Sequence, residues 1–292
     1  MPVQAGQMMT ITNLLGAASD TCGLVQARYG LMLHWRFDRY IGRSLARYGE
    51  WCEGEMTLMG SACRPGDVVV DAGANVGSHA LAFAHAVGPE GQVHAFEPQL
   101  ETASLLGANA AINGLRQIHM HPLALAEHEQ TLSVRPLVYD RSEQNVGGVS
   151  LQTDGLGRAT RAEALDRCLD PPSLRLIKAD VEGMELSVVR GAAGLINQFH
   201  PLLYLENDRV DRSKALIEGV QALNYRLYWH RVMLVNPNNF AGNSENLFPG
   251  VVSTNMVAAH ESDHLTGPEL IPVHPDEHPS LPDWPGRHKP IE

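Results

Sequence analysis

A run of β-branched residues leads into a glycine-containing turn and then into a helix, and this arrangement constrains the fold more than any other feature of the sequence. Residues 68–70 (VVV) predict a strand buried on both faces, because such strands are apolar without alternation. Residues 71–77 (DAGANVG) supply the turn, and an apolar stripe from Val76 to Val87 predicts the helix. A strand–turn–helix unit of this kind indicates a Rossmann-like α/β fold with a mostly parallel sheet.

The alternation of strands and helices continues to about residue 258, which favours one main domain over residues 63–260. Further strands are expected at residues 92–96, 118–121, 131–137, 174–179, 202–205, 225–229 and 251–258. Further helices are expected before the stop at Asn113-Gly114 and at residues 184–197 and 213–223.

Three segments do not follow the alternation. Residues 1–62 are predicted to be a helical extension without a strand, and we hypothesise that it forms a lid over a substrate with an aromatic wall made of Trp35, Phe37, Tyr40, Tyr48 and Trp51. Residues 139–158 are rich in glycine and predict an exposed loop. Residues 261–292 are rich in proline, histidine and acidic groups and predict an irregular tail.

The net charge and the lengths of the apolar stretches limit which classes of binding partner are expected. The net charge is −11 and no run of lysine and arginine occurs, so nucleic acid is not expected and a small molecule is. No apolar stretch approaches the ~20 residues that span a bilayer, so no membrane association is expected, and we predict a cytoplasmic protein. The four scattered cysteines argue against a zinc site or a disulfide framework. A homo-oligomer is compatible with the sequence.

The spacing of the glycines in the turn discriminates between ligands. Gly73 and Gly77 lie four positions apart, and Asn75 stands where a dinucleotide-binding turn has its middle glycine. A side chain there obstructs a pyrophosphate, which argues against a nicotinamide-dependent oxidoreductase. S-adenosylmethionine has no phosphate, and Asp71 is placed to bind its ammonium group. The turn therefore favours S-adenosylmethionine.

A second acidic residue supports this interpretation. Glu97 ends the expected strand at residues 92–96, twenty positions after Gly77. A carboxylate at this distance can accept hydrogen bonds from both hydroxyl groups of a ribose. The glycine turn and Glu97 together are more specific than either alone.

Three motifs together resemble the FkbM family of methyltransferases. They are residues 71–77, residues 94–98 (HAFEP) and residues 177–185 (IKADVEGME), and the resemblance extends over about residues 64–258. It implies the class I methyltransferase fold, with a seven-stranded sheet whose last strand is antiparallel and helices on both faces. It also implies O-methylation of a natural product or sugar, without naming the acceptor. Residues 145–148 (NVGG) look like a family feature that closes over the site.

The resemblance and the strand ends together give a set of expected site residues. Asp180 ends a strand and is expected to act as a base or to orient the acceptor, while Glu182 and His230 are further catalytic candidates. The expected cofactor-binding residues are Asp71, Gly73, Asn75, Gly77, Glu97, Pro98, Ala124 and Asp180.

A magnesium ion stays open but is not favoured. If present, it would bind Asp180, Glu206 and Asn207, because hard oxygen ligands at these strand ends suit that ion. N-methylation and a non-catalytic S-adenosylmethionine-binding role are the remaining alternatives. Residues 170–173 (DPPS) resemble a motif of amino-group methyltransferases, but they precede a strand rather than follow one.

Overall fold

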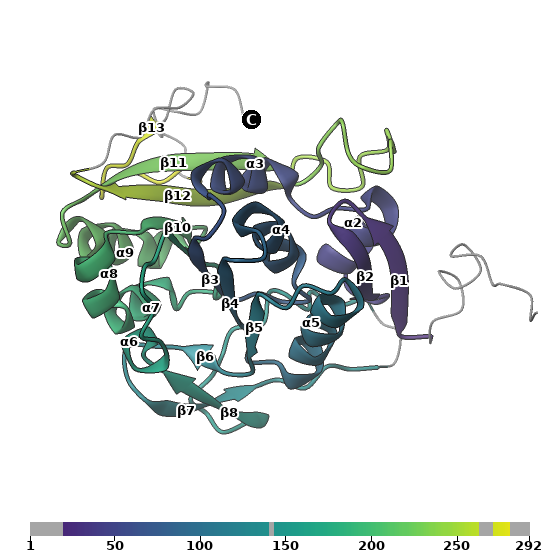
Figure 1. Cartoon of the computed structure of the whole chain (residues 1–292), viewed down its shortest axis with the longest axis horizontal. Coiled ribbons are helices and arrows are strands. Elements are labelled where there is room, and N and C mark those ends of the chain that lie inside the picture. The colour runs from purple at the N-terminus through teal and green to yellow at the C-terminus, as the bar shows by residue number, and fades with distance from the viewer. Residues whose placement is uncertain (1–19, 140–142, 263–270, 281–292) are drawn as a thin grey trace, which may run out of the picture.

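The computed structural model describes residues 20–139, 143–262 and 271–280. Its centre is an eight-stranded sheet with the order β13-β11-β12-β10-β9-β3-β4-β5 (Figure 1). In that order the strands are Ile271–Pro272, Tyr225–Met233, Val252–His260, Leu202–Glu206, Leu176–Ala179, Val68–Ala72, Gln92–Phe96 and Ile118–His121. Strands β10, β9, β3, β4 and β5 are parallel, whereas β12 is antiparallel to both of its neighbours.

The expected number of seven strands is corrected to eight. The additional strand, β13, comes from the segment expected to be an irregular tail, and it pairs with β11. Without it, β11 would be the edge of the sheet and its outer backbone groups would lack strand partners. The expected α/β class and the antiparallel strand near the end of the chain are both present.

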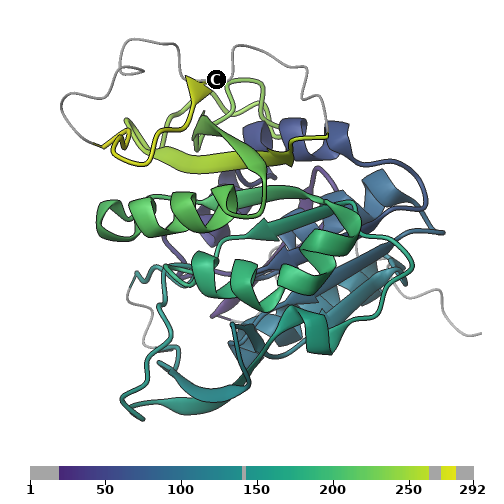
Figure 2. The same cartoon turned by 90° about the vertical axis from the view of Figure 1, so that its left-hand side faces the viewer.

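Helices cover both faces of the sheet. One face carries α3 (Glu53–Ala62), α4 (Ser78–Val87) and α5 (Leu100–Ile112), and the other carries α6 (Leu165–Cys168), α7 (Glu185–Gly191), α8 (Ala193–Phe199) and α9 (Val210–Gln221). Strand β3 is buried on both sides, because Val69 packs in the core with α4 while Val68 and Val70 pack in the core with α7–α9. Figure 2 shows α7–α9 in front of the strands. The single helix expected at residues 184–197 is two short helices that meet at Ala192.

The N-terminal extension is not wholly helical, so that expectation was wrong. Strands β1 (Cys22–Ala27) and β2 (Gly30–Trp35) form a hairpin before α2 (Ile41–Tyr48). Two asparagines bind the backbone of β2. The side chain of Asn109, in α5, bonds to Leu33 N and O, and that of Asn113, the residue that follows α5, bonds to Leu31 N and O. The hairpin therefore depends on partners some 80 positions away, which local sequence does not report.

A small second sheet lies beside the main one. It has the order β6-β8-β7, formed by Ala124–Leu125, Arg158–Glu163 and Gln130–Val134. It occupies the lower side of the molecule in both views (Figures 1 and 2). Strand β8 was not expected from the sequence. Within the described ranges no helix has the length and apolar character that a membrane crossing requires.

Candidate active site

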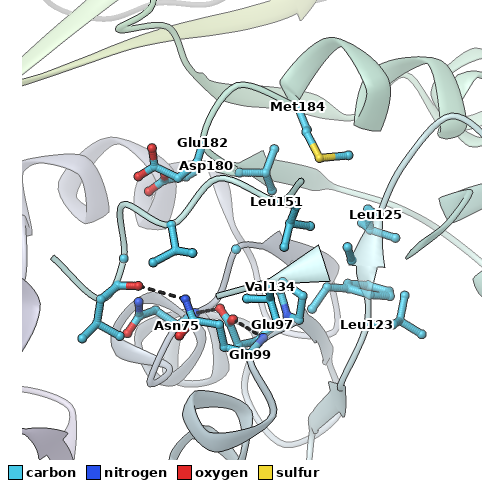
Figure 3. A pocket seen from close by; sticks show the side chains of 18 residues that line it. Asn75, Glu97, Gln99, Leu123, Leu125, Val134, Leu151, Asp180, Glu182 and Met184 are labelled. Atoms are coloured by element: carbon cyan, nitrogen blue, oxygen red, sulfur yellow. Dashed lines mark hydrogen bonds between the residues drawn. The ribbon is translucent and has the colours of Figure 1, made fainter. Parts of the chain in front are cut away.

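Two connected cavities open where β3, β4, β9 and β10 end. The first, which we name the inner pocket, has a lining that includes Glu97, Ala124 and Met184, and Figure 3 shows it from close by. The second, which we name the outer cleft, extends from Tyr40 and Trp51 to Glu206. The residues that line both are Gly73, Asn75, Glu97, Gly147, Asp180 and Glu182. A ligand in the inner pocket can therefore face a ligand in the outer cleft.

The turn after β3 brings two strand ends into contact. Gly73 has a φ of 76°, and a Cβ atom there would lie 1.8 Å from the carbonyl oxygen of Asp180. Only glycine allows this approach. Asn75 also has a positive φ and lines both cavities, whereas Gly77 caps the N-terminus of α4 and lines neither.

Glu97 follows β4 and is 5% exposed. Its Oε2 accepts a hydrogen bond of 2.9 Å from Asn75 N, and its Oε1 accepts one of 2.8 Å from Gln99 N. Burial raises the pKa of Glu97 to about 7, against the lowering effect of these two bonds. Each carboxylate oxygen keeps a second lone pair for a ligand. Pro98 and Ala124, two more of the residues expected to bind the cofactor, also line the inner pocket.

Asp71 does not have the position that was expected. Its side chain is fully buried and lines neither cavity. Lys178 Nζ lies 3.1 Å from Asp71 Oδ1, and the two residues are register partners in β3 and β9. In this structure Asp71 therefore neutralises Lys178 beneath the site instead of facing a ligand.

Three carboxylates meet in the outer cleft. Asp180, Glu182 and Glu206 each have an oxygen atom within 4.8 Å of the others. In Figure 3 the carboxylates of Asp180 and Glu182 lie side by side. Glu182 has a φ of 57° and forms an ion pair with Arg209. Burial, followed by the charge of Asp180, raises the pKa of Glu182 to about 7.

Two other expected residues lie away from this cluster. The Nδ2 of Asn207 donates to Ser213 Oγ and Met256 Sδ, and Asn207 lines neither cavity, whereas Glu182 lies with Asp180 and Glu206. His230 lies inside β11, because that strand continues to Met233, and its Nδ1 is 2.9 Å from the hydroxyl of Tyr204. His230 lines neither cavity, which corrects its placement at the active edge.

Sequence reasoning missed a loop contact that closes the inner pocket. Val146 N donates to Asp38 Oδ1 at 3.3 Å, and Val146 O accepts a bond of 3.0 Å from Gln99 Nε2. Gly147, the next residue, lines both cavities. The segment expected to close over the site thus lies there, held by the N-terminal extension and by the start of α5. No local signal marked Asp38 or Gln99.

The missed residue Glu55 forms part of the outer cleft. It is 4% exposed, its Oε1 accepts a 3.0 Å bond from Asn255 Nδ2, and His79 Nε2 lies 3.6 Å from its Oε2. Burial raises the pKa of Glu55 and lowers that of His79. Of the expected aromatic wall, Tyr40 and Trp51 line this cleft. The other three residues of that wall, Trp35, Phe37 and Tyr48, are buried in the protein core.

Among solved structures, this chain is similar to several methyltransferases. A search of solved structures gives methyltransferase FkbM from Methylobacillus flagellatus KT, at 17% identity and TM-score 0.43, covering 68% of this chain and 44% of that one. It also gives an O-methyltransferase from Thermotoga maritima, at 13% identity and TM-score 0.45, covering 71% and 64%. A third is the O-methyltransferase TomG from Streptomyces achromogenes, solved with S-adenosylmethionine, at 11% identity and TM-score 0.42, covering 71% and 79%. The chain thus spans less than half of the first structure and less than two thirds of the second.

The family comparison covers the elements that form the site. No curated protein matches this chain. The model of the methyltransferase FkbM domain, however, matches residues 71–227, which include the glycine turn, Glu97, Asp180 and Glu206. This match argues against the nicotinamide-dependent alternative. Because it extends over more than half of the sequence, the chain belongs to the FkbM family of methyltransferases.

Proposed function

We propose that this protein transfers a methyl group from S-adenosylmethionine to a hydroxyl group of a small molecule, such as a natural product or a sugar. The observation that carries the proposal is the junction of the two cavities, where Asp180 and Glu182 line both. A cofactor in the inner pocket and an acceptor in the outer cleft would meet at these carboxylates. Methyl transfer requires such alignment of two reactants.

The inner pocket fits the chemistry of this cofactor. One side is apolar, formed by Leu123, Leu125, Val134, Leu151 and Met184, and suits a flat purine (Figure 3). The lining also includes the buried carboxylate of Glu97, which suits a ribose diol. Asn75 N donates to Glu97, and Gly73 lies against the carbonyl oxygen of Asp180, so the turn contacts both residues and could bind the amino-acid portion. When bound, S-adenosylmethionine supplies an electrophilic methyl group.

Asp180 is the residue best placed to act on an acceptor hydroxyl. Its side chain is 39% exposed and lines both cavities, and Lys178 Nζ lies 3.7 Å from its Oδ2. Its carboxylate can accept the hydroxyl proton or orient the hydroxyl by a hydrogen bond. This role needs no metal ion, and the amide expected as a magnesium ligand, Asn207, faces α9 instead.

Calorimetry tests the cofactor, and a transfer assay tests the reaction. The proposal expects S-adenosylmethionine and S-adenosylhomocysteine to bind and NAD to give no heat of binding. Incubation with radiolabelled S-adenosylmethionine and a panel of hydroxylated metabolites should then label a product as an ether that resists acid hydrolysis. Binding of NAD in place of S-adenosylmethionine would contradict the proposal, as would label found only on nitrogen.

A further inference from the structure

The outer cleft is lined by more acidic than basic side chains. Its lining includes the carboxyl groups of Glu55, Asp180, Glu182, Glu206 and Asp208. Among the described lining residues only Arg209 is a cation, and it already pairs with Glu182. Lys178 lies behind Asp180 and is shared with Asp71. The charges within the protein therefore leave part of this cluster without a counterion.

Among the carboxyl groups of the outer cleft, Glu206 is the one with a buried oxygen atom, Oε2, that lacks a hydrogen-bond partner in the described part of the chain. Burial, followed by the charge of Asp180, raises the pKa of Glu206 well above its ordinary value. A buried carboxyl oxygen without a hydrogen-bond partner destabilises the protein, so a ligand that supplies a donor there is favoured.

The geometry of the cluster suits a cationic nitrogen. The oxygen atoms of Asp180, Glu182 and Glu206 lie within 4.8 Å of one another, so a single atom can lie within about 2.8 Å of all three, the usual length of an N⁺–H···O⁻ bond. An ammonium group has three N–H donors, one for each carboxylate.

Two features favour an organic ammonium group over a metal ion. The Arg209 guanidinium contacts Glu182, and its charge would repel a divalent ion more strongly than a monovalent one. The cleft also continues from the cluster to Tyr40 and Trp51, whose rings can contact the body of an organic molecule but have no role for a bare ion.

We propose that the methyl acceptor carries an ammonium group, which Asp180, Glu182 and Glu206 bind in the outer cleft. This inference rests on the proposed function and specifies its acceptor class as an amino alcohol or amino sugar. A protonated amine has no lone pair with which to accept a methyl group. The amine is therefore the anchor, and a hydroxyl of the same molecule is the acceptor, positioned at the second oxygen of Asp180.

A matched pair of probes tests the charge requirement. Serinol (2-amino-1,3-propanediol) and glycerol share a skeleton and differ in one ammonium group. Their binding is measured by saturation-transfer NMR titration near neutral pH, with and without S-adenosylhomocysteine. We expect serinol to bind at least about tenfold more tightly than glycerol, because hydrogen bonds between charged groups contribute more than neutral ones. Equal binding of the two probes would overturn the inference.

Variants locate the effect. In Glu206→Gln the preference for serinol should fall to within about twofold, while affinity for S-adenosylhomocysteine stays at the wild-type value and reports that the site is folded. Glu90→Gln is the matched control, because Glu90 is exposed beyond the C-terminal end of α4, opposite the site. A serinol preference that survives in both Glu206→Gln and Glu182→Gln would also overturn the inference.

Two further measurements distinguish the possible outcomes. Binding of Mn²⁺ tests whether the cluster is a metal site, and binding of S-adenosylhomocysteine tests whether the protein binds the cofactor at all. Mn²⁺ binding, followed by water-proton relaxation, should be absent or unaffected by serinol. Mn²⁺ that displaces serinol and is lost in Glu206→Gln would identify a divalent cation site and overturn the inference. If S-adenosylhomocysteine binds but serinol shows no preference, the acceptor class alone is wrong. If S-adenosylhomocysteine fails to bind the wild-type protein, the proposed function fails.

Discussion

Lys178 and Asp71 face each other across two neighbouring parallel strands, with Nζ 3.1 Å from Oδ1, and neither side chain is more than 2% exposed. The same lysine nitrogen lies 3.7 Å from Asp180 Oδ2. Burial alone would lower the pKa of Lys178, but the carboxylates, Asp71 first, outweigh it and raise that pKa, so the lysine is charged. One buried cation thus links the strand that begins the glycine turn to the carboxylate at the junction of the two cavities.

The first prediction concerns the stability that depends on this pair. Lys178→Met leaves Asp71 without a counterion in the core and should lower the free energy of unfolding by about 3–5 kcal/mol. Urea denaturation measures the change. Lys214→Met is the control, because that lysine pairs with Asp276 at the exposed surface, where solvent screens the pair, and its loss should change the stability far less. Equal stability of the two variants would show that the buried pair does not support the fold.

The second prediction concerns the contact between the turn and β9. Gly73→Ala places a methyl group against the carbonyl oxygen of Asp180, so it should both destabilise the protein and weaken S-adenosylmethionine binding. Gly66→Ala is matched to it, since Gly66 has a φ of 90° but nothing lies within 4 Å of its added Cβ. That control should cost only about 1–2 kcal/mol from backbone strain and leave binding intact. Equal effects of the two changes in urea denaturation and calorimetry would exclude a role for the close contact.

The third prediction is a pH dependence set by Glu97. Its pKa of about 7 lies above the ordinary value of a glutamate, so the ligand-free protein binds a proton there that the unfolded chain releases near pH 4.5. The resulting stability is present below that pH and is lost as the pH rises through about 7. If Glu97 binds the ribose as proposed, its ionised form is the better acceptor, so affinity for S-adenosylmethionine should instead rise, by about tenfold from pH 6 to pH 8.

Glu97→Gln checks the assignment of this titration. The variant should bind S-adenosylmethionine about 10–100-fold more weakly at pH 8, because a charged hydrogen-bond acceptor is replaced by a neutral one. Its affinity should also change less with pH than that of the wild type. Calorimetry at both pH values decides the matter, and an unchanged pH profile would assign the titration to another group.

The fourth prediction concerns Asp180. Asp180→Asn keeps the shape of the side chain but removes the base, so turnover should fall by about 10²–10⁴-fold. Affinity for S-adenosylmethionine should stay within about threefold of the wild-type value, since Glu97 and the apolar side of the inner pocket are unchanged. EDTA should not affect the wild-type rate. Normal turnover in Asp180→Asn would remove Asp180 from the mechanism, and inhibition by EDTA that magnesium reverses would require a metal.

Much of the fold and the central part of the site could be predicted from local patterns. The β-branched run at residues 68–70 predicted a strand buried on both faces, and β3 is such a strand. The glycines at positions 73 and 77 predicted the turn, and both have a positive φ. Because parallel strands carry their loops at one edge, residues that follow β4 and β9 had to meet there. The proximity of Glu97 and Asp180 in the lining of one pocket follows from this rule.

The direction in which each side chain points could not be predicted in the same way. Asp71 and Glu97 occupy similar places at the ends of neighbouring strands, yet only Glu97 faces the cavity. Asp71 is the last-but-one residue of β3, and its side chain meets Lys178 in the interior. The sequence did contain one signal for the inward orientation of Asp71. Lys178 stands between Ile177 and Ala179 in a strand expected to be buried, and a buried ammonium group requires a carboxylate partner.

The sequence by itself determined the α/β class, the order of the main strands and helices, and the family motifs, because each depends on residues within a few turns of one another. The tertiary structure alone decided the N-terminal hairpin, the eighth strand and the membership of the acidic cluster. Asn109 in α5 and Asn113 directly after it stabilise the hairpin, and Glu182 lies beside Asp180 with a left-handed backbone and an ion pair with Arg209. Such contacts join distant segments, and their energies exist only once the chain has brought those segments together.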